Sequence, residues 1–397
     1  MRRAYLDHAS TSPLRPVVRD AMVAALDVVA GDPGRLHAEG RRHRVALEEA
    51  RASVAELLGA RPREVVFTSG GTEAVNTAVT GAVERARASA GGAPPHAVVT
   101  AVEHSSVGEA VERAGADVSI IGVDGLGRYD PATVLDAVRA DTALVSIQSA
   151  NHEVGTRQPW EAVAAGLPDM PGAALLHLDA CAGVIDLVGS WKGFIGSGVD
   201  LCSVTAHKSG GPAGTGALLV RRGLRIAPMI VGGAQERDRR AGLENVVAAT
   251  GFGALATELS GPGRLASELD TAREQTSAIE RETSSAVEGV TVFGDSGNRL
   301  GTLVCFGVEG VEAEPILLGL DQRGVAAHSG SSCSSEILEP SPVLAAMGVD
   351  ADHSLRVSVG WNTSDADVAL FLEAFPIVVD GLRSLRPPSR RSDAAAP

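Results

Sequence analysis

The sequence has 397 residues, of which 44% are hydrophobic and 21% are charged, and its formal net charge is −14. This composition is typical of a globular protein of about two domains, and the lack of a long basic run argues against nucleic acid as a direct partner. We expect a cytoplasmic protein without a membrane span, because the N-terminus MRRAYLDHAS lacks the apolar core of a secretory signal and no run of about 18 apolar residues occurs.

Helix and strand patterns alternate over the first two thirds of the chain. Residues 41–58 carry apolar residues at helical spacing, and Gly59 ends this helix. Residues 64–83 predict a strand, a glycine-rich turn and a helix. Further buried strands are expected within residues 96–107, 142–150, 173–183, 200–208 and 216–222. Runs of valine, leucine and isoleucine with little alternation are typical of a parallel sheet that is covered on both faces.

The pattern changes near residue 261, where a long polar helix begins, and short strand patterns follow it. We therefore predict an α/β protein in which residues 16–260 form a large domain with a mainly parallel sheet. Residues 261–386 would form a smaller C-terminal α+β domain with an antiparallel sheet. Residues 1–15 are expected to form an arm that packs with the small domain, and residues 387–397 a disordered tail.

Lysine is rare in this chain. Of 35 lysines and arginines only Lys192 and Lys208 are lysines. A guanidinium stays protonated and cannot do amine chemistry, so a retained lysine can mark an amine with a chemical role. Lys208 follows a strand pattern in the glycine-rich segment SVTAHKSGGPAGTGALLV. One interpretation is a Schiff-base lysine with Thr205 and His207 as phosphate ligands; the other is an ordinary loop lysine.

Three other strand ends carry candidate ligands. In FTSGGTEAVNTAV, Gly71 and Thr72 open a helix whose free N–H groups suit a phosphate, although such turns are also plain helix caps. Asp179 follows an apolar strand and could keep a ring nitrogen protonated, or it could only cap a turn. His104 follows another strand, and it could stack on a flat ring and move protons or be structural.

Arg356 and the cysteines complete the set of candidates. Arg356 lies inside an apolar strand pattern, where its guanidinium needs either a substrate carboxylate or a structural partner. None of the four cysteines forms a C-x-x-C pair, so reduced thiols are expected. Cys333 lies in AAHSGSSCSSEILEPS, a composition typical of a mobile loop, and is the candidate nucleophile. Three cysteines are expected to pack in the interior: Cys181, Cys202 and Cys305.

The order and spacing of these segments resemble the cysteine desulfurases of the class V aminotransferase family, which are pyridoxal phosphate enzymes of fold type I. The resemblance extends from residue 5 to residue 360. The motifs that carry it are LDHAST, SGGTEAVNTA, EHSSV, NHEVG (151–155), HLDA, TAHKSGGPAGTGAL, GGAQERDRRAGLENV (232–246), SGSSCSSEILEPSPVL and LRVSVG.

The resemblance implies pyridoxal 5′-phosphate as cofactor, L-cysteine as substrate, no metal, a homodimer and a sulfur-acceptor protein. Lys208 would hold the cofactor and move the Cα proton, Asp179 would pair with the ring nitrogen, and His104 would stack on the ring. The resemblance also implies that Thr72, Thr205 and His207 bind the phosphate. Asn151 and Arg356 would bind the substrate carboxylate, and Cys333 would attack the substrate sulfur. The segment near 235–245 would complete the active site of the partner chain.

Two positions depart from the family pattern. Ala182 stands where the family usually has a glutamine that bonds the phenolic oxygen of the cofactor, and Leu243 replaces a threonine that reaches the phosphate. These departures predict weakened or retuned cofactor binding. They keep two alternatives open: a related selenocysteine lyase or carbon–sulfur lyase, and a weakly catalytic scaffold in a sulfur relay.

Overall fold

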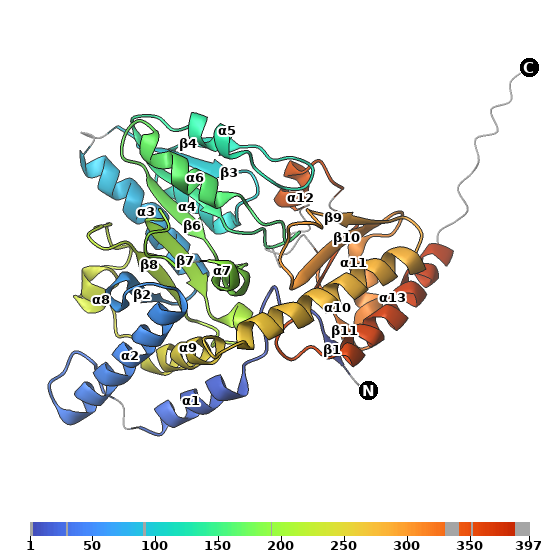
Figure 1. Ribbon diagram of the computed structural model, residues 1–397, viewed down its shortest axis with the longest axis horizontal. Helices are drawn as coiled ribbons and strands as arrows, with labels where there is room; N and C mark the ends of the chain where they lie inside the picture. Colours follow the sequence, from blue (N-terminus) through green and yellow to red (C-terminus); the bar gives the residue numbers. More distant parts are fainter. Residues whose placement is uncertain are drawn as a thin grey trace, which may run out of the picture.

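The computed structural model describes residues 3–28, 31–89, 93–191, 193–329, 341–350 and 352–385 (Figure 1). Cys333, Lys192 and the predicted tail lie outside the described residues. The α-helices are α1 (Pro16–Leu26), α2 (Ala38–Leu57), α3 (Gly71–Ser89), α4 (Ser105–Arg113), α5 (Pro131–Asp136), α6 (Trp160–Gly166), α7 (Val184–Ser190), α8 (Gln235–Asp238), α9 (Val246–Leu259), α10 (Arg264–Ala286), α11 (Ala313–Gln322), α12 (Pro342–Ala346) and α13 (Asp365–Ser384). The strands are β1 (Ala4–Tyr5), β2 (Val65–Thr68), β3 (His96–Thr100), β4 (Asp117–Ile121), β5 (Thr142–Gln148), β6 (Leu175–Asp179), β7 (Leu201–Thr205), β8 (Gly216–Val220), β9 (Val290–Phe293), β10 (Leu303–Val308), β11 (Val325–Ala326) and β12 (Ser354–Ser358).

A seven-stranded sheet in the order β2-β8-β7-β6-β5-β3-β4 forms the centre of the larger half. Strand β8 is antiparallel to both of its neighbours, and the strands from β7 to β4 are parallel to one another. Strand β2 therefore points the same way as β7. Six strands thus end at one edge of the sheet, which is where ligands bind in open α/β folds.

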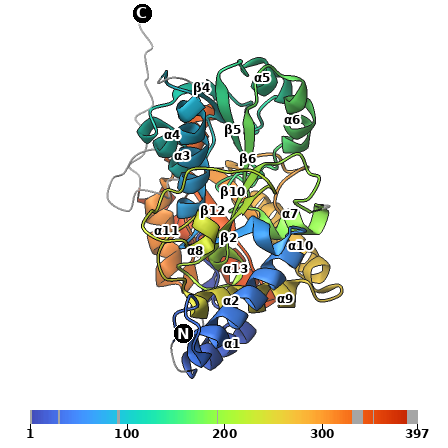
Figure 2. The same ribbon diagram turned by 90° about the vertical axis from the view of Figure 1, so that its left-hand side faces the viewer.

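Both faces of this sheet are buried, because successive side chains of each strand point to opposite faces. On β6, Leu175 packs with α3 and α4, whereas Leu176 and Leu178 pack into the core under α2, α6 and α9. Figure 2 shows α3 and α4 on one side of the sheet and α5 and α6 on the other. The predicted α/β fold with a mainly parallel, doubly covered sheet is confirmed.

The smaller half contains an antiparallel sheet in the order β12-β10-β9, covered by α10, α11 and α13 (Figure 1). Its core includes Phe306, Phe371 and Phe375, whose rings contact one another. Near the N-terminus β1 pairs in parallel with β11, and Asp7 forms a bridge to Ser358 of β12. Among the described residues, no helix is both long and apolar enough to cross a membrane.

Candidate active site

A cavity of about 270 Å³ opens at the edge where the parallel strands end. The segments after β2, β3, β5, β6 and β7 all contribute to its wall, and β12 and the N-terminal segment close it from the smaller half. The lining residues are Ala9, Ser10, Gly71, Thr72, Val75, His104, Ser106, Gln148, Ala150, His152, Asp179, Cys181, Ala182, Thr205, His207, Lys208 and Arg356. Eight of the sequence-predicted residues therefore meet in one cavity.

Asp179 is the last residue of β6, and it is buried at this edge. One carboxylate oxygen accepts a hydrogen bond from the backbone N–H of Cys181 at 2.9 Å, which fixes the side chain in the turn after the strand. The side chain also lines the cavity. A carboxylate held in this way provides a fixed negative charge for a cationic ring nitrogen.

His104 is the N-cap of α4. The backbone N–H of Ser106 donates to its Nδ1 at 3.1 Å, so the proton of the neutral ring lies on Nε2. Burial first, and then the neighbouring His152, lower the pKa of His104 to about 4. The imidazole is therefore neutral at physiological pH, which suits stacking on a flat ring better than a charged imidazolium would.

The residues predicted to hold a phosphate surround the first turn of α3. Thr205 ends β7, and its Oγ1 lies 2.7 Å from Nδ1 of His207. Gly71 begins α3, and a Cβ at this position would lie 2.5 Å from Sγ of Cys181. Glycine is therefore required for close packing here, while the helix N-terminus offers unpaired N–H groups beside Thr72. We call Gly71, Thr72, Thr205 and His207 the phosphate cradle, because together they suit a dianion.

Lys208 lies in the short 3₁₀ turn His207–Ser209, which directly follows β7. Ser12 Oγ donates a hydrogen bond to the carbonyl oxygen of Lys208 at 2.8 Å, and this contact ties the turn to the N-terminal segment. Gly210 ends the turn in a left-handed conformation with φ of 84°. This backbone is positioned from both sides, so the amine is presented to the cavity from a rigid turn.

Arg356 on β12 is buried, and it faces the cavity from the smaller half. Its guanidinium donates to the carbonyl oxygen of His152 at 2.9 Å, to Ser10 Oγ at 2.8 Å and to Asp7 at 3.2 Å. Within the described residues its Nε is buried without a hydrogen-bond partner. A buried guanidinium with an unused N–H is suited to bind a small carboxylate.

Asn151 is placed differently from the other predicted residues. Its side chain is fully buried, and it does not line the cavity. Its Oδ1 accepts from the N–H groups of Glu153 and Val154, and its Nδ2 donates to the carbonyl oxygen of Val102. In the structure, Asn151 shapes the turn that carries His152, and its role toward a substrate carboxylate stays a prediction.

A model of the family described as aminotransferase class-V matches residues 4–371. The chain belongs to this family. It is 38% identical to a protein named cysteine desulfurase IscS from Dictyoglomus turgidum, and the match covers 97% of each chain. Among solved structures it is similar to a NifS-like protein, with 26% identity, a TM-score of 0.87 and coverage of 96% of this chain and 100% of the other. It is also similar to DndA from Streptomyces lividans, with 30% identity, a TM-score of 0.74 and coverage of 89% and 99%.

His152 and Gln148 are two of the lining residues that the sequence analysis of this class V chain did not single out. His152 contacts His104 edge to face, with ring centroids 5.2 Å apart, and Gln148 ends β5 at the cavity wall. Beneath them, burial raises the pKa of Glu103 to about 8, so this carboxyl group is neutral at physiological pH. His152 was present in the motif NHEVG, but nothing in the sequence distinguished its side chain from that of a turn residue.

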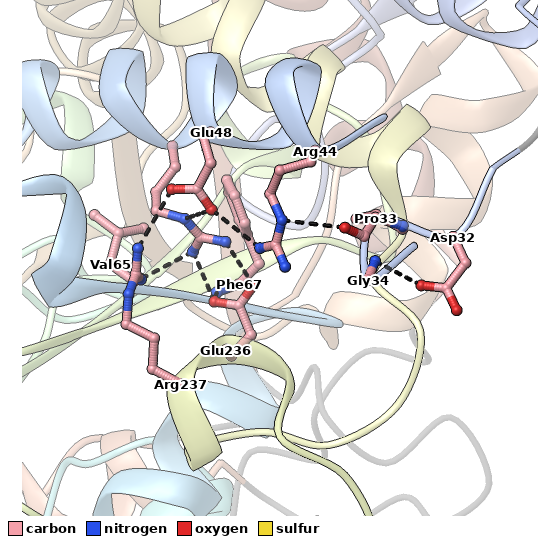
Figure 3. A network of polar contacts seen from close by, with 10 residues as sticks. Asp32, Pro33, Gly34, Arg44, Glu48, Val65, Phe67, Glu236 and Arg237 are labelled. Atoms are coloured by element: carbon pink, nitrogen blue, oxygen red, sulfur yellow. Dashed lines mark hydrogen bonds and ion pairs between the residues drawn. The ribbon is translucent and has the colours of Figure 1, made fainter. Parts of the chain in front are cut away.

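The segment predicted to serve the partner chain is anchored firmly in its own protomer. Glu236, Arg237 and Asp238 all have positive φ, a conformation that costs on the order of 1–3 kcal/mol for each residue. Glu236 compensates this cost through a buried, two-pronged ion pair with Arg51, at 2.7 and 2.8 Å, and it also accepts from the N–H of Phe67. Figure 3 shows Glu236 beside Phe67, with Arg237 next to it near Glu48.

A second ion pair connects this segment to the phosphate cradle. Arg240 lies 2.9 Å from Glu73 in the first turn of α3, and Glu73 also accepts from the N–H of Ser69 in the turn before that helix. Apolar side chains of the same region are exposed, and Val231 and Leu243 have relative exposures of 75% and 64%. The segment is therefore fixed to the site while its apolar side faces outward.

The described cysteines are predicted to be inert in the native state. Burial raises the pKa of Cys305 to about 12, and it raises the pKa values of Cys202 and Cys181 well above the usual value. At neutral pH almost no thiolate exists at these positions, and the thiolate is the nucleophile. We expect iodoacetamide to label only Cys333 rapidly in the folded protein, as read by mass spectrometry of peptides. Rapid labelling that persists in a Cys333→Ser variant would contradict this.

Proposed function

We propose that this protein is a pyridoxal-phosphate-dependent cysteine desulfurase, which converts L-cysteine to L-alanine and holds the sulfur as a persulfide on Cys333. The observation that carries the proposal is the meeting of Lys208, Asp179, His104 and Arg356 in one cavity of a class V chain. The similarity to proteins named cysteine desulfurase over nearly their whole length supports the same activity.

The polar groups in the cavity fit this cofactor by their chemistry. An amine for its aldehyde, a carboxylate for its ring nitrogen and a cradle for its phosphate are all present at Lys208, Asp179 and the first turn of α3. When bound, the cofactor withdraws electrons from the Cα of the substrate amino acid. Lys208 would hold it and carry the Cα proton, and the neutral ring of His104 would lie against its face.

Substrate binding and sulfur transfer need two further residues. The buried guanidinium of Arg356 would bind the α-carboxylate of cysteine, and this orients the amino group toward Lys208. The Cys333 thiolate would attack the substrate sulfur, so that an S–S bond forms and the Cβ–S bond breaks. The electron pair of the broken Cβ–S bond leaves with the carbon skeleton. Protonation of that skeleton gives alanine, so cysteine and a thiol become alanine and a persulfide.

A homodimer in the cytoplasm, serving a sulfur-acceptor protein, completes the proposal. The exposed apolar side chains of the 229–245 region, among them Val231 and Leu243, support self-association, because a partner chain that covered them would remove apolar surface from water. Arg240 and Glu73 link this surface to the phosphate cradle. In the proposed dimer, the segment that contacts the partner chain would also support the phosphate cradle of its own protomer.

The activity test compares wild-type protein with Cys333→Ala. The wild type should form alanine from L-cysteine and, with a reductant, release sulfide in equal amount. Cys333→Ala should lose at least about 100-fold of the rate, because the persulfide cannot form on the protein. Cys181→Ala and Cys305→Ala serve as thiol controls for protein-bound persulfide, which should disappear only with Cys333. A preference for a substrate without sulfur or selenium would contradict the proposal.

A further inference from the structure

His152 is held rigidly in the turn after β5. The preceding Asn151 accepts two backbone hydrogen bonds through Oδ1, and its own N–H donates to the carbonyl oxygen of Thr156 at 2.9 Å. The backbone carbonyl of His152 is in turn bound by Arg356. Only about 10% of the His152 side chain is exposed. The backbone that carries the imidazole is therefore held in place, and the imidazole lines the cavity.

A smaller cavity of about 40 Å³ adjoins the main one, and four residues line both: Ala9, His152, Ala182 and Lys208. None of the cradle residues lines the smaller cavity: Gly71, Thr72, Thr205 and His207. His152 and Ala182 consequently lie on the side of Lys208 that is turned away from the cradle. They share one space, and Ala182 places no hydrogen-bonding group in it.

The structure of pyridoxal phosphate indicates which of its atoms would lie on this side of Lys208. The aldehyde carbon that joins lysine is attached to one ring carbon. The two neighbours of that ring carbon carry the phosphate arm on one side and the phenolic oxygen on the other. With the phosphate in the cradle and the linkage at Lys208, the phenolic oxygen faces away from the cradle. We propose that His152 supplies the hydrogen bond to this phenolic oxygen, in the space that Ala182 leaves open.

Three other polar side chains that line the main cavity already have hydrogen-bond partners. Gln148 donates through Nε2 to the carbonyl oxygen of Val102 at 2.7 Å, and Ser10 accepts from Arg356. Ser106 is bound to His104. Among the described residues, the side chain of His152 has a 3.5 Å contact from Nε2 to Glu153 and the ring contact with His104. Its ring is tilted by 62° to that of His104, and a nitrogen at the edge of such a tilted imidazole can donate to a flat ring that lies against His104.

The charged and titratable groups around His152 come from four elements. His104 precedes α4, Glu153 follows in the same turn, Lys208 lies after β7, and Arg356 reaches the backbone from β12. A hydrogen bond to the phenolic oxygen stabilises its anionic form, and this lowers the affinity of the adjacent Lys208 nitrogen for a proton. His152 therefore sets the pH at which the visible band of the bound cofactor changes.

The test measures that pH midpoint by absorbance in the resting protein, together with the dissociation constant for added pyridoxal phosphate. His152→Ala should raise the midpoint by about 0.4–1 unit, the equivalent of one neutral hydrogen bond, and weaken cofactor binding several-fold. Adding Ala182→Gln, which places a carboxamide in the same space, should restore most of both values. His353→Ala is the matched control, because this histidine does not line either cavity, and it should change neither value.

The outcomes separate this inference from the proposed function on which it rests. A wild-type protein without any titrating cofactor band would overturn the proposed function. A wild-type band that titrates, with the same midpoint in His152→Ala, would overturn only the role of His152. His152→Asn guards against misfolding of the alanine variant, because it keeps a donor in the turn and should stay within about 0.3 unit of the wild-type midpoint. A midpoint in His152→Asn as high as in His152→Ala would also contradict the role.

Discussion

Lys208→Ala is expected to lower alanine formation from L-cysteine by about 10³-fold or more. Lys208 lines the cavity, and none of the other described lining residues carries an amine that could substitute for it. Without it, the cofactor loses its covalent attachment and the Cα proton loses its carrier. Lys208→Arg should be equally impaired, because a guanidinium keeps the positive charge but does not deprotonate. Alanine production and the visible absorbance of the purified protein measure both effects.

The chain contains its own matched control for this experiment. Lys192 is the other lysine in the sequence, so Lys192→Ala removes the same group at a position without a predicted role. Its rate and absorbance should match those of the wild type. A Lys208→Ala protein that retains more than about a tenth of the wild-type rate would show that the amine is dispensable. Loss of absorbance in Lys192→Ala but not in Lys208→Ala would mean that Lys192, and not Lys208, holds the cofactor.

Much of the site could be predicted from the sequence because the fold is a parallel sheet. Asp179 and Thr205 end apolar strands, His104 and Lys208 lie shortly after such strands, and parallel strands end at a common edge. Local sequence patterns were therefore sufficient to bring together residues that are far apart in the chain. The family resemblance, confirmed by the class V match, implied the role proposed for each of these residues.

The remaining features depend on contacts that have no local signal. His152 lines the cavity only because Asn151 folds the following backbone onto its own amide, and the sequence cannot distinguish this turn from one that points outward. Glu236 lies in a segment that the sequence assigns to a partner contact, yet its carboxylate is buried against Arg51, 185 residues away. Polar residues in loops are normally solvated, so neither burial could be read from composition.

Glu236→Gln is expected to destabilise the protein by about 3–5 kcal/mol. The carboxylate and the guanidinium of Arg51 each have a side-chain exposure of 1%, so the substitution leaves the buried positive charge with only the partly exposed carboxylate of Glu48, 3.3 Å from its Nε. The guanidinium also lies 4.9 Å from the centre of the Phe67 ring and donates to the carbonyl oxygen of Val65. These contacts are weaker than the buried, two-pronged ion pair that the substitution removes. Urea unfolding followed by tryptophan fluorescence measures the loss.

A substitution of the neighbouring Arg237 shows how much of the expected stability loss is due to the burial of the ion pair. It also has positive φ and also contacts an acidic residue, Glu48, but its side chain is 39% exposed. Arg237→Ala should therefore cost no more than about 1 kcal/mol. Equal losses for Glu236→Gln and Arg237→Ala would mean that the buried pair does not hold the segment. A much larger loss for Glu236→Gln, with weaker self-association on gel filtration, is the result expected if this ion pair keeps three strained residues and the exposed Leu243 in position.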